Sequence, residues 1–218
     1  MRIVVIGTGT EVGKTHVTEC LLVHARALGV RAAAYKPIAT GVVDRCEDAE
    51  RHAAASATSY VQPSFAYRRP VSPHLAAREE GRPIDLDVIR RQASELEADV
   101  DVLIIEGAGG LFTPLADTFT NVELVRAVLP GVVILVGPDR LGVLHDVGAT
   151  RAAAAAREVP IRAVVLSSPA QPDDSTSSNA IELERLGLGP VVGVLPRARA
   201  DAAESQLVAR KLWSLLDF

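Results

Sequence analysis

Five side chains of this sequence could together bind a polyphosphate and a divalent cation. They are Lys14, Thr15, Lys36, Asp48 and Glu106. Ammonium groups attract phosphate oxygens, and hydroxyl and carboxylate oxygens are the ligands that Mg²⁺ prefers. The chemistry that these residue types favour is therefore the binding of a nucleoside triphosphate together with Mg²⁺.

Lys14 and Thr15 lie where a predicted turn becomes a predicted helix. In the predicted strand at residues 2–6, Ile3 to Ile6 are apolar and β-branched. The segment from Gly7 to Thr15 is rich in glycine, and an apolar helical pattern continues to about Leu28. In such a strand–turn–helix, backbone N–H groups and the positive end of the helix dipole face an anion. We expect Lys14 to reach the β- and γ-phosphates and the Thr15 hydroxyl to bind Mg²⁺.

The glycine spacing departs from the usual phosphate-loop motif. Gly-x4-Gly-Lys-Ser/Thr would require a glycine at position 8, whereas this chain has Thr8 between Gly7 and Gly9. The alternative interpretation is a plain glycine-rich turn whose lysine points to water. The flanking strand and helix favour phosphate binding over this alternative.

Lys36, Asp48 and Glu106 could reach the same loop. Lys36 follows a predicted strand at residues 30–35, and ligands of α/β sheets lie beyond the carboxyl ends of the strands. Glu106 follows the apolar run 102–105 and precedes three glycines within four positions, where phosphate-loop enzymes keep a second magnesium carboxylate. Each residue has an ordinary alternative: a lysine or an acid that leaves the sheet for solvent, and for Asp48 the favoured first turn of a helix.

The remaining pattern alternates strands with helices. Apolar runs predict strands at residues 132–136, 161–166 and 191–195. Helical patterns cover residues 44–56, 86–96 (with Asp85 as the N-cap), 121–129 and 143–157, a helix that ends near Gly187, and a last helix that ends near Leu216. Residues 59–83 contain several prolines and predict a long loop, with a short helix at 73–80 capped by Ser72. These βα units predict an α/β, P-loop NTPase fold, with a mainly parallel sheet and helices on both faces, as a single domain over residues 1–218.

The composition and net charge of the chain exclude several classes of protein. The 218 residues are 48% hydrophobic but only 4% aromatic, which suits apolar strands covered by alanine-rich helices. The net charge of −4 gives no basic surface for nucleic acid or an anionic membrane. Cys20 and Cys46 form no disulfide framework or zinc pattern. A strand from residue 2 leaves no room for a signal peptide, and no apolar run could span a membrane. We expect a soluble cytoplasmic protein.

Several segments, taken together, resemble the dethiobiotin synthetase family. They are Gly7 to Thr15, Lys36 to Gly41, Ser72 to His74, Glu80 to Ile84 and Glu106 to Leu111. Their order and separations fit the family well over the N-terminal two thirds of the chain and more loosely beyond. That family's phosphate loop has the same longer glycine spacing.

The resemblance implies closure of the ureido ring of dethiobiotin from 7,8-diaminopelargonic acid, CO₂ (or bicarbonate) and ATP, through a carbamate and a carbamic–phosphoric anhydride. It implies catalytic roles for Lys36, Lys14 and Thr10, and Mg²⁺ ligands at Thr15, Asp48 and Glu106. The implied nucleotide-binding residues are Thr10, Glu11, Val12, Gly13, Lys14, Thr15, Asp48, Glu106, Gly109, Ser167 and Pro196. The implied substrate-binding residues are Thr40, Ser72, Pro73, Gly109, Leu141, Gly142 and Leu144. In the family's homodimers, the loop that matches Leu141 to His145 reaches the substrate carboxylate of the neighbouring subunit.

One position departs from the family pattern. Where family members often place an asparagine that reads the nucleotide base, this chain has Ser167. A serine cannot offer both an amide donor and an acceptor to a base edge. We therefore expect an altered or relaxed base preference.

Two other classes of protein remain open. A corrin-amidase-like synthetase domain normally belongs to a longer chain with a glutaminase domain, and no nucleophilic cysteine follows residue 150 here. A partitioning-type ATPase switch typically has a second lysine early in the phosphate loop, where this chain has Gly7 to Thr10. Such a switch also needs a basic or membrane-binding surface. The final helix, expected from Ser205 to Phe218, is amphipathic but carries only Arg210 and Lys211 as basic residues, so we expect it to pack on the sheet.

Overall fold

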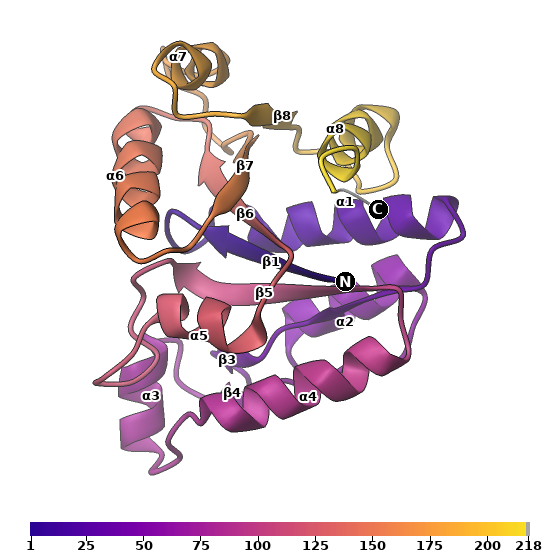
Figure 1. Cartoon of the computed structure of the whole chain (residues 1–218), viewed down its shortest axis with the longest axis vertical. Coiled ribbons are helices and arrows are strands. Elements are labelled where there is room, and N and C mark those ends of the chain that lie inside the picture. Colours follow the sequence, from indigo (N-terminus) through magenta and orange to yellow (C-terminus); the bar gives the residue numbers. More distant parts are fainter. Residues whose placement is uncertain (217–218) are drawn as a thin grey trace.

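The computed structural model describes residues 1–216, and in it a parallel sheet lies between two layers of helices (Figure 1). The strands are β1 (Arg2–Gly7), β2 (Ala32–Tyr35), β3 (Ile38–Thr40), β4 (Phe65–Tyr67), β5 (Val102–Gly110), β6 (Val132–Pro138), β7 (Ile161–Ser167) and β8 (Val191–Leu195). The helices are α1 (Lys14–Ala27), α2 (Glu47–Ser56), α3 (Pro73–Glu79), α4 (Leu86–Ala98), α5 (Asn121–Val128), α6 (Val143–Ala156), α7 (Asn179–Arg185) and α8 (Ala203–Trp213).

The main sheet has six strands in the order β2-β5-β1-β6-β7-β8, and all of its pairs are parallel. Along β1, Ile3 and Val5 face one side and Val4 and Ile6 face the other, and all four are fully buried. A strand that is buried on both faces has no polar alternation, which is why the central strands read as unbroken apolar runs. The predicted fold class is confirmed.

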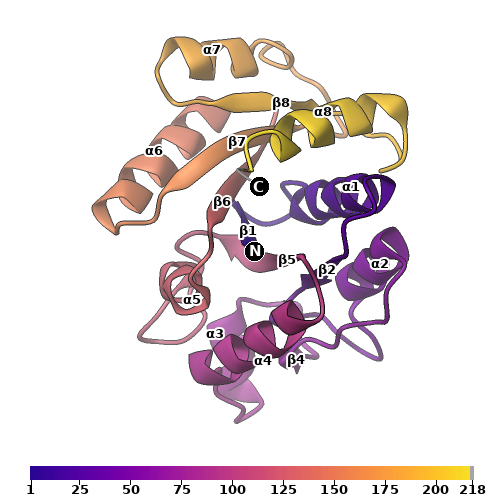
Figure 2. The same ribbon diagram turned by 45° about the vertical axis from the view of Figure 1, so that its right-hand side comes forward.

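Each face of the sheet packs against its own set of helices (Figures 1 and 2). The α1 and α8 helices lie side by side against one face, with Leu21 and Leu212 among their buried residues. The α4, α5 and α6 helices cover the other face, with Ile89, Val125 and Val147 buried there. This arrangement leaves the carboxyl ends of β1, β2 and β5 free to carry the loops of a site.

The structure differs from the sequence-based expectations in three segments. The long loop expected at residues 59–83 contains β4, which pairs in parallel with β3 in a separate two-stranded sheet. The strand expected to end before Glu106 continues to Gly110. The last helix was expected to end near Leu216, but α8 ends at Trp213, and residues 217–218 lie outside the described part of the chain.

Both residues expected at N-cap positions precede their helices, but only Asp85 caps its helix with its side chain. Asp85 precedes α4 and accepts a hydrogen bond from the Asp87 N–H at 2.8 Å. Ser72 precedes α3, but its hydroxyl does not cap the helix and instead lies 3.0 Å from Nδ1 of His74. Of the helices in residues 1–216, none combines the length and the apolar character needed to cross a membrane.

Candidate functional site

A cavity of about 1290 Å³ opens where β1, β2 and β5 end. Most of the predicted site residues line it: Thr10, Glu11, Val12, Gly13, Lys14, Thr15, Lys36, Thr40, Asp48, Ser72, Pro73, Glu106 and Gly109. The sequence places them in five separate segments, and the parallel sheet brings these segments to one edge.

The turn between β1 and α1 forms one wall of this cavity. Gly13 precedes α1 with a φ of 96°, and a Cβ atom on it would lie 2.8 Å from Cβ and Oγ of Ser167, so only glycine fits. Nζ of Lys14 donates to the carbonyl of Gly9 at 3.0 Å. Burial lowers the pKa of Lys14 to about 8. A phosphate beside this ammonium group would stabilise its charged form, and the N-terminus of α1 adds N–H donors to the same position.

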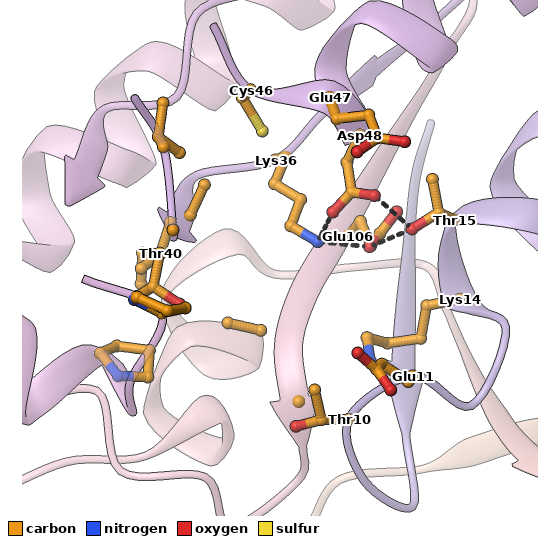
Figure 3. A pocket seen from close by; sticks show the side chains of 18 of the residues that line it. Thr10, Glu11, Lys14, Thr15, Lys36, Thr40, Cys46, Glu47, Asp48 and Glu106 are labelled. Atoms are coloured by element: carbon orange, nitrogen blue, oxygen red, sulfur yellow. Dashed lines mark hydrogen bonds and ion pairs between the residues drawn. The ribbon is translucent and has the colours of Figure 1, made fainter. Parts of the chain in front are cut away.

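Thr15, Lys36, Asp48 and Glu106 meet beside this wall of the cavity (Figure 3). Oγ1 of Thr15 lies 2.9 Å from Oδ1 of Asp48 and 3.1 Å from Oε1 of Glu106, and it can donate its proton to one of them at a time. Nζ of Lys36 donates to Oε1 of Glu106 at 2.6 Å and also to Oδ2 of Asp48. These four predicted residues therefore form one connected cluster.

The cluster contains a buried ion pair. Glu106 is fully buried, and Lys36 is 8% exposed. Burial alone would raise the pKa of Glu106, but the charge of Lys36 and the contact with His52 hold that pKa below its ordinary range. Burial would also lower the pKa of Lys36, but the charges of Glu106 and Asp48 outweigh it and raise that pKa. Both groups are therefore charged at neutral pH.

The oxygens of this cluster fit Mg²⁺. Proteins commonly bind Mg²⁺ through one or two carboxylates and let substrate phosphates and water complete the octahedron. Thr15, Asp48 and Glu106 supply a hydroxyl and two carboxylates of this kind. In residues 1–216 no group of three or more His, Cys, Asp or Glu side chains could hold a metal ion by itself. The ammonium group of Lys36 between the two carboxylates indicates that this position favours positive charge.

Two of the predicted nucleotide-binding residues, Ser167 and Pro196, do not line the cavity but contact its phosphate-loop wall. Oγ of Ser167 donates to the carbonyl of Val12 at 2.7 Å. The carbonyl of Pro196 lies 3.2 Å from Nε2 of His16, the residue that follows Thr15. Both contacts connect the carboxyl ends of β7 and β8 to the phosphate loop and the start of α1.

The loop between β6 and α6 lies outside the cavity of this single chain. Leu141 is 77% exposed there, and Gly142 precedes α6 with a φ of 96°. Leu144 belongs to α6 and packs against the hydrophobic core. The structure therefore does not bring the three predicted substrate residues of this segment together with the others.

Two buried polar residues that contact β5 were not identified from the sequence. His52 on α2 is 2% exposed, and its Nε2 lies 2.9 Å from Oε2 of Glu106. Asn121, at the start of α5, is fully buried and donates from Nδ2 to the carbonyls of Ala108 and Gly110 at 2.7 Å each. A signal existed for His52, because it follows Asp48 by four residues and so shares its helix face.

The parallel sheet, the glycine-rich turn and the lysine at the start of α1 define a P-loop nucleoside triphosphate-binding protein. A family model described as an AAA domain matches residues 1–205. An ATP-dependent dethiobiotin synthetase from Nitrosospira multiformis is 38% identical to this chain, covering 98% of it and 93% of its own length. Another, from Escherichia coli K12, is 33% identical and covers 89% of this chain and 90% of its own. The chain belongs to the ATP-dependent dethiobiotin synthetase family and is an enzyme of the ligase class.

Solved structures with similar folds include proteins of other functions. The cell division ATPase MinD of Pyrococcus furiosus superposes with a TM-score of 0.59 at 16% identity, over 98% of this chain and 99% of that one. The signal recognition particle receptor FtsY of Elizabethkingia anophelis gives a TM-score of 0.55 at 17% identity, over 96% of this chain and 64% of that one. At these identities the similarity establishes the fold alone.

Proposed function

We propose that this chain closes the ureido ring of dethiobiotin from 7,8-diaminopelargonic acid, CO₂ and ATP, yielding ADP and phosphate. The observation that carries the proposal is the cluster of Thr15, Lys36, Asp48 and Glu106, which lines the same cavity as the phosphate loop and shares Thr15 with it. The family membership supports the choice of substrates, and the chemistry of the cluster is that of phosphoryl transfer. In this proposal residues 1–218 act as a single domain.

The proposed reaction forms two bonds to the carbon of CO₂. One substrate amine attacks CO₂ and loses a proton to give a carbamate. A carbamate oxygen then attacks the γ-phosphorus and displaces ADP, which gives a carbamic–phosphoric anhydride. The second amine attacks the carbonyl carbon, loses a proton, closes the ring and expels phosphate. Phosphoryl transfer of this kind needs positioning and neutralisation of charge more than covalent help.

In this proposal the residues of the cavity have different roles. Lys14 and the loop N–H groups hold the β- and γ-phosphates, with Thr10 and Glu11 beside them. Lys36 stabilises the negative charge shared by the carbamate and the γ-phosphate. Thr15, Asp48 and Glu106 would hold Mg²⁺, which when bound neutralises charge on the phosphate oxygens. The proposed substrate contacts are Thr40, Ser72, Pro73 and Gly109 from the same chain, and Leu141, Gly142 and Leu144 from a second copy in a homodimer.

A coupled assay for phosphate release tests the proposal. We expect phosphate to form only when diaminopelargonic acid, bicarbonate, ATP and Mg²⁺ are all present. The amount of phosphate should equal the amount of dethiobiotin, measured by mass spectrometry. Phosphate release that does not depend on diaminopelargonic acid would contradict the proposed reaction. If DNA or lipid vesicles stimulated that release, the partitioning-type ATPase would become the better interpretation.

Base preference is a separate prediction from Ser167. Its hydroxyl donates to the Val12 carbonyl, so its one proton is already used. We expect turnover with CTP and GTP to approach that with ATP, measured as kcat/KM for each nucleotide at saturating diaminopelargonic acid. Ser167→Asn is expected to widen the differences in kcat/KM between ATP, CTP and GTP. A strong preference of the wild-type enzyme for ATP alone would rule this idea out.

A further inference from the structure

The two oxygens of Glu106 face different partners. Oε1 lies 2.6 Å from Nζ of Lys36 and 3.1 Å from Oγ1 of Thr15, on the side of the cavity. Oε2 lies 2.9 Å from Nε2 of His52. Glu106 is fully buried, and His52 is only 2% exposed and does not line the cavity. One edge of the carboxylate therefore faces the site, and the other edge contacts α2.

The α2 helix supplies both Asp48, which belongs to the cluster in the cavity, and His52, which contacts Oε2 of Glu106. Asp48 and His52 are four positions apart in α2, so their side chains leave the same face of the helix. Asp48 contacts Thr15 and Lys36, whereas among the described polar groups the imidazole of His52 contacts only Oε2 of Glu106. Packing of α2 against α1 and β2 thus fixes both contacts together.

The imidazole of His52 has no competing polar partner. Nδ1 is buried without a hydrogen bond, and Nε2 approaches Oε2 of Glu106 closely but without the alignment of a linear hydrogen bond. A proton on Nε2 places an N–H group against the carboxylate and leaves Nδ1 as an unpaired acceptor. The opposite neutral tautomer would set a lone pair against the carboxylate and bury an unpaired donor. The surroundings therefore favour a proton on Nε2.

We propose that His52 is a positioning residue that holds Oε2 of Glu106 and leaves only Oε1 available to a divalent cation. The inference rests on the proposed use of a magnesium nucleotide at this site. Mg²⁺ accepts single oxygens in a tight octahedron, whereas Ca²⁺ has a larger shell and commonly takes both oxygens of a carboxylate. By withholding the second oxygen, His52 makes the site selective for Mg²⁺ over Ca²⁺.

Calorimetric binding of a non-hydrolysable ATP analogue, with Mg²⁺ or with Ca²⁺, tests this role without turnover. His52→Met removes the N–H donor at similar volume, and His52→Gln keeps a donor near the position of Nε2. We expect the preference for Mg²⁺ over Ca²⁺ to fall about tenfold in His52→Met, since partners of metal-ligating carboxylates typically contribute at least this much. We expect His52→Gln to retain most of the preference. His24→Met is the matched control, because His24 is a histidine of α1 that contacts Gln206.

The outcomes separate this inference from the proposed reaction. An unchanged preference in His52→Met, an equal loss in His52→Gln, or a wild-type protein indifferent to the two cations would overturn the role of His52. A selective wild-type protein that forms no dethiobiotin would instead contradict the reaction and leave the inference standing. Should His52→Met fail to fold, ¹⁵N NMR of histidine-labelled wild-type protein provides the test. A proton on Nε2 supports the inference, and a proton on Nδ1 alone contradicts it.

Discussion

Lys36→Ala is expected to lower turnover by about 10²- to 10³-fold, the usual loss when one group that stabilises transition-state charge is removed. Lys36 donates to both Asp48 and Glu106 at the edge of the cavity, where the carbamate and the γ-phosphate are proposed to meet. The phosphate-loop wall with Lys14 is unchanged by the substitution. Binding of a non-hydrolysable ATP analogue should therefore stay close to wild type while phosphate release is lost.

The same substitution should also destabilise the fold, and this effect has to be separated from catalysis. Without Lys36, the fully buried Glu106 loses its ammonium partner, and breaking a buried pair from one side costs about 3–5 kcal/mol. The double variant Lys36→Ala/Glu106→Gln removes one of the two unpaired carboxylates. We expect urea unfolding to show recovered stability in the double variant, with no recovery of turnover. If the double variant recovered both stability and turnover, the role of Lys36 would be structural only.

The strand, turn and helix that carry the phosphate loop depend on local sequence and were predicted correctly. The apolar run before Gly7, the glycines of the turn and the helical pattern after Lys14 are all within one short segment, and the structure has the predicted strand, loop and helix there. Lys36 was placed beside this loop because it follows a strand, and strand ends of a parallel sheet share an edge. The cluster with Asp48 and Glu106 agrees with that reasoning.

The segments that were predicted incorrectly depend on contacts between distant residues. The β3 and β4 strands have three residues each, too few for a periodic signal, and they form because Ile38 pairs with Phe65. The glycines after Glu106 suggested a turn, yet β5 continues to Gly110. The side chain of Asn121 there donates to the backbone carbonyls of Ala108 and Gly110.

His52 illustrates a limit of another kind. The sequence contains its spacing from Asp48, but a histidine in an acidic, alanine-rich helix is usually exposed. Its burial arises because α2 packs against α1 and β2, which brings this helix face over Glu106. No pattern within α2 specifies that packing, since it depends on the order of strands in the sheet. The contacts that Oε1 and Oε2 of Glu106 make on opposite sides likewise depend on the order of strands in the sheet and are not specified by a local pattern.

Glu106→Gln is expected to raise the concentration of Mg²⁺ needed for half-maximal turnover by at least about tenfold. The substitution keeps the shape of the side chain but replaces a charged oxygen, shared by Lys36 and Thr15, with a neutral amide. It should also lower stability by about 1–3 kcal/mol, since Lys36 loses one of its two carboxylates in a buried position.

Glu47→Gln is the matched control for Glu106→Gln, because Glu47 lines the same cavity from α2 but lies outside the hydrogen-bonded cluster. Titrating Mg²⁺ at fixed, saturating ATP measures the requirement in both variants, and urea unfolding measures their stability. The magnesium requirement of Glu47→Gln should match that of the wild type. If Glu106→Gln lost stability without any change in its magnesium requirement, Glu106 would be a partner of Lys36 in the folded chain rather than a ligand. The cation would then be held by Thr15 and Asp48, the more exposed carboxylate of the cluster.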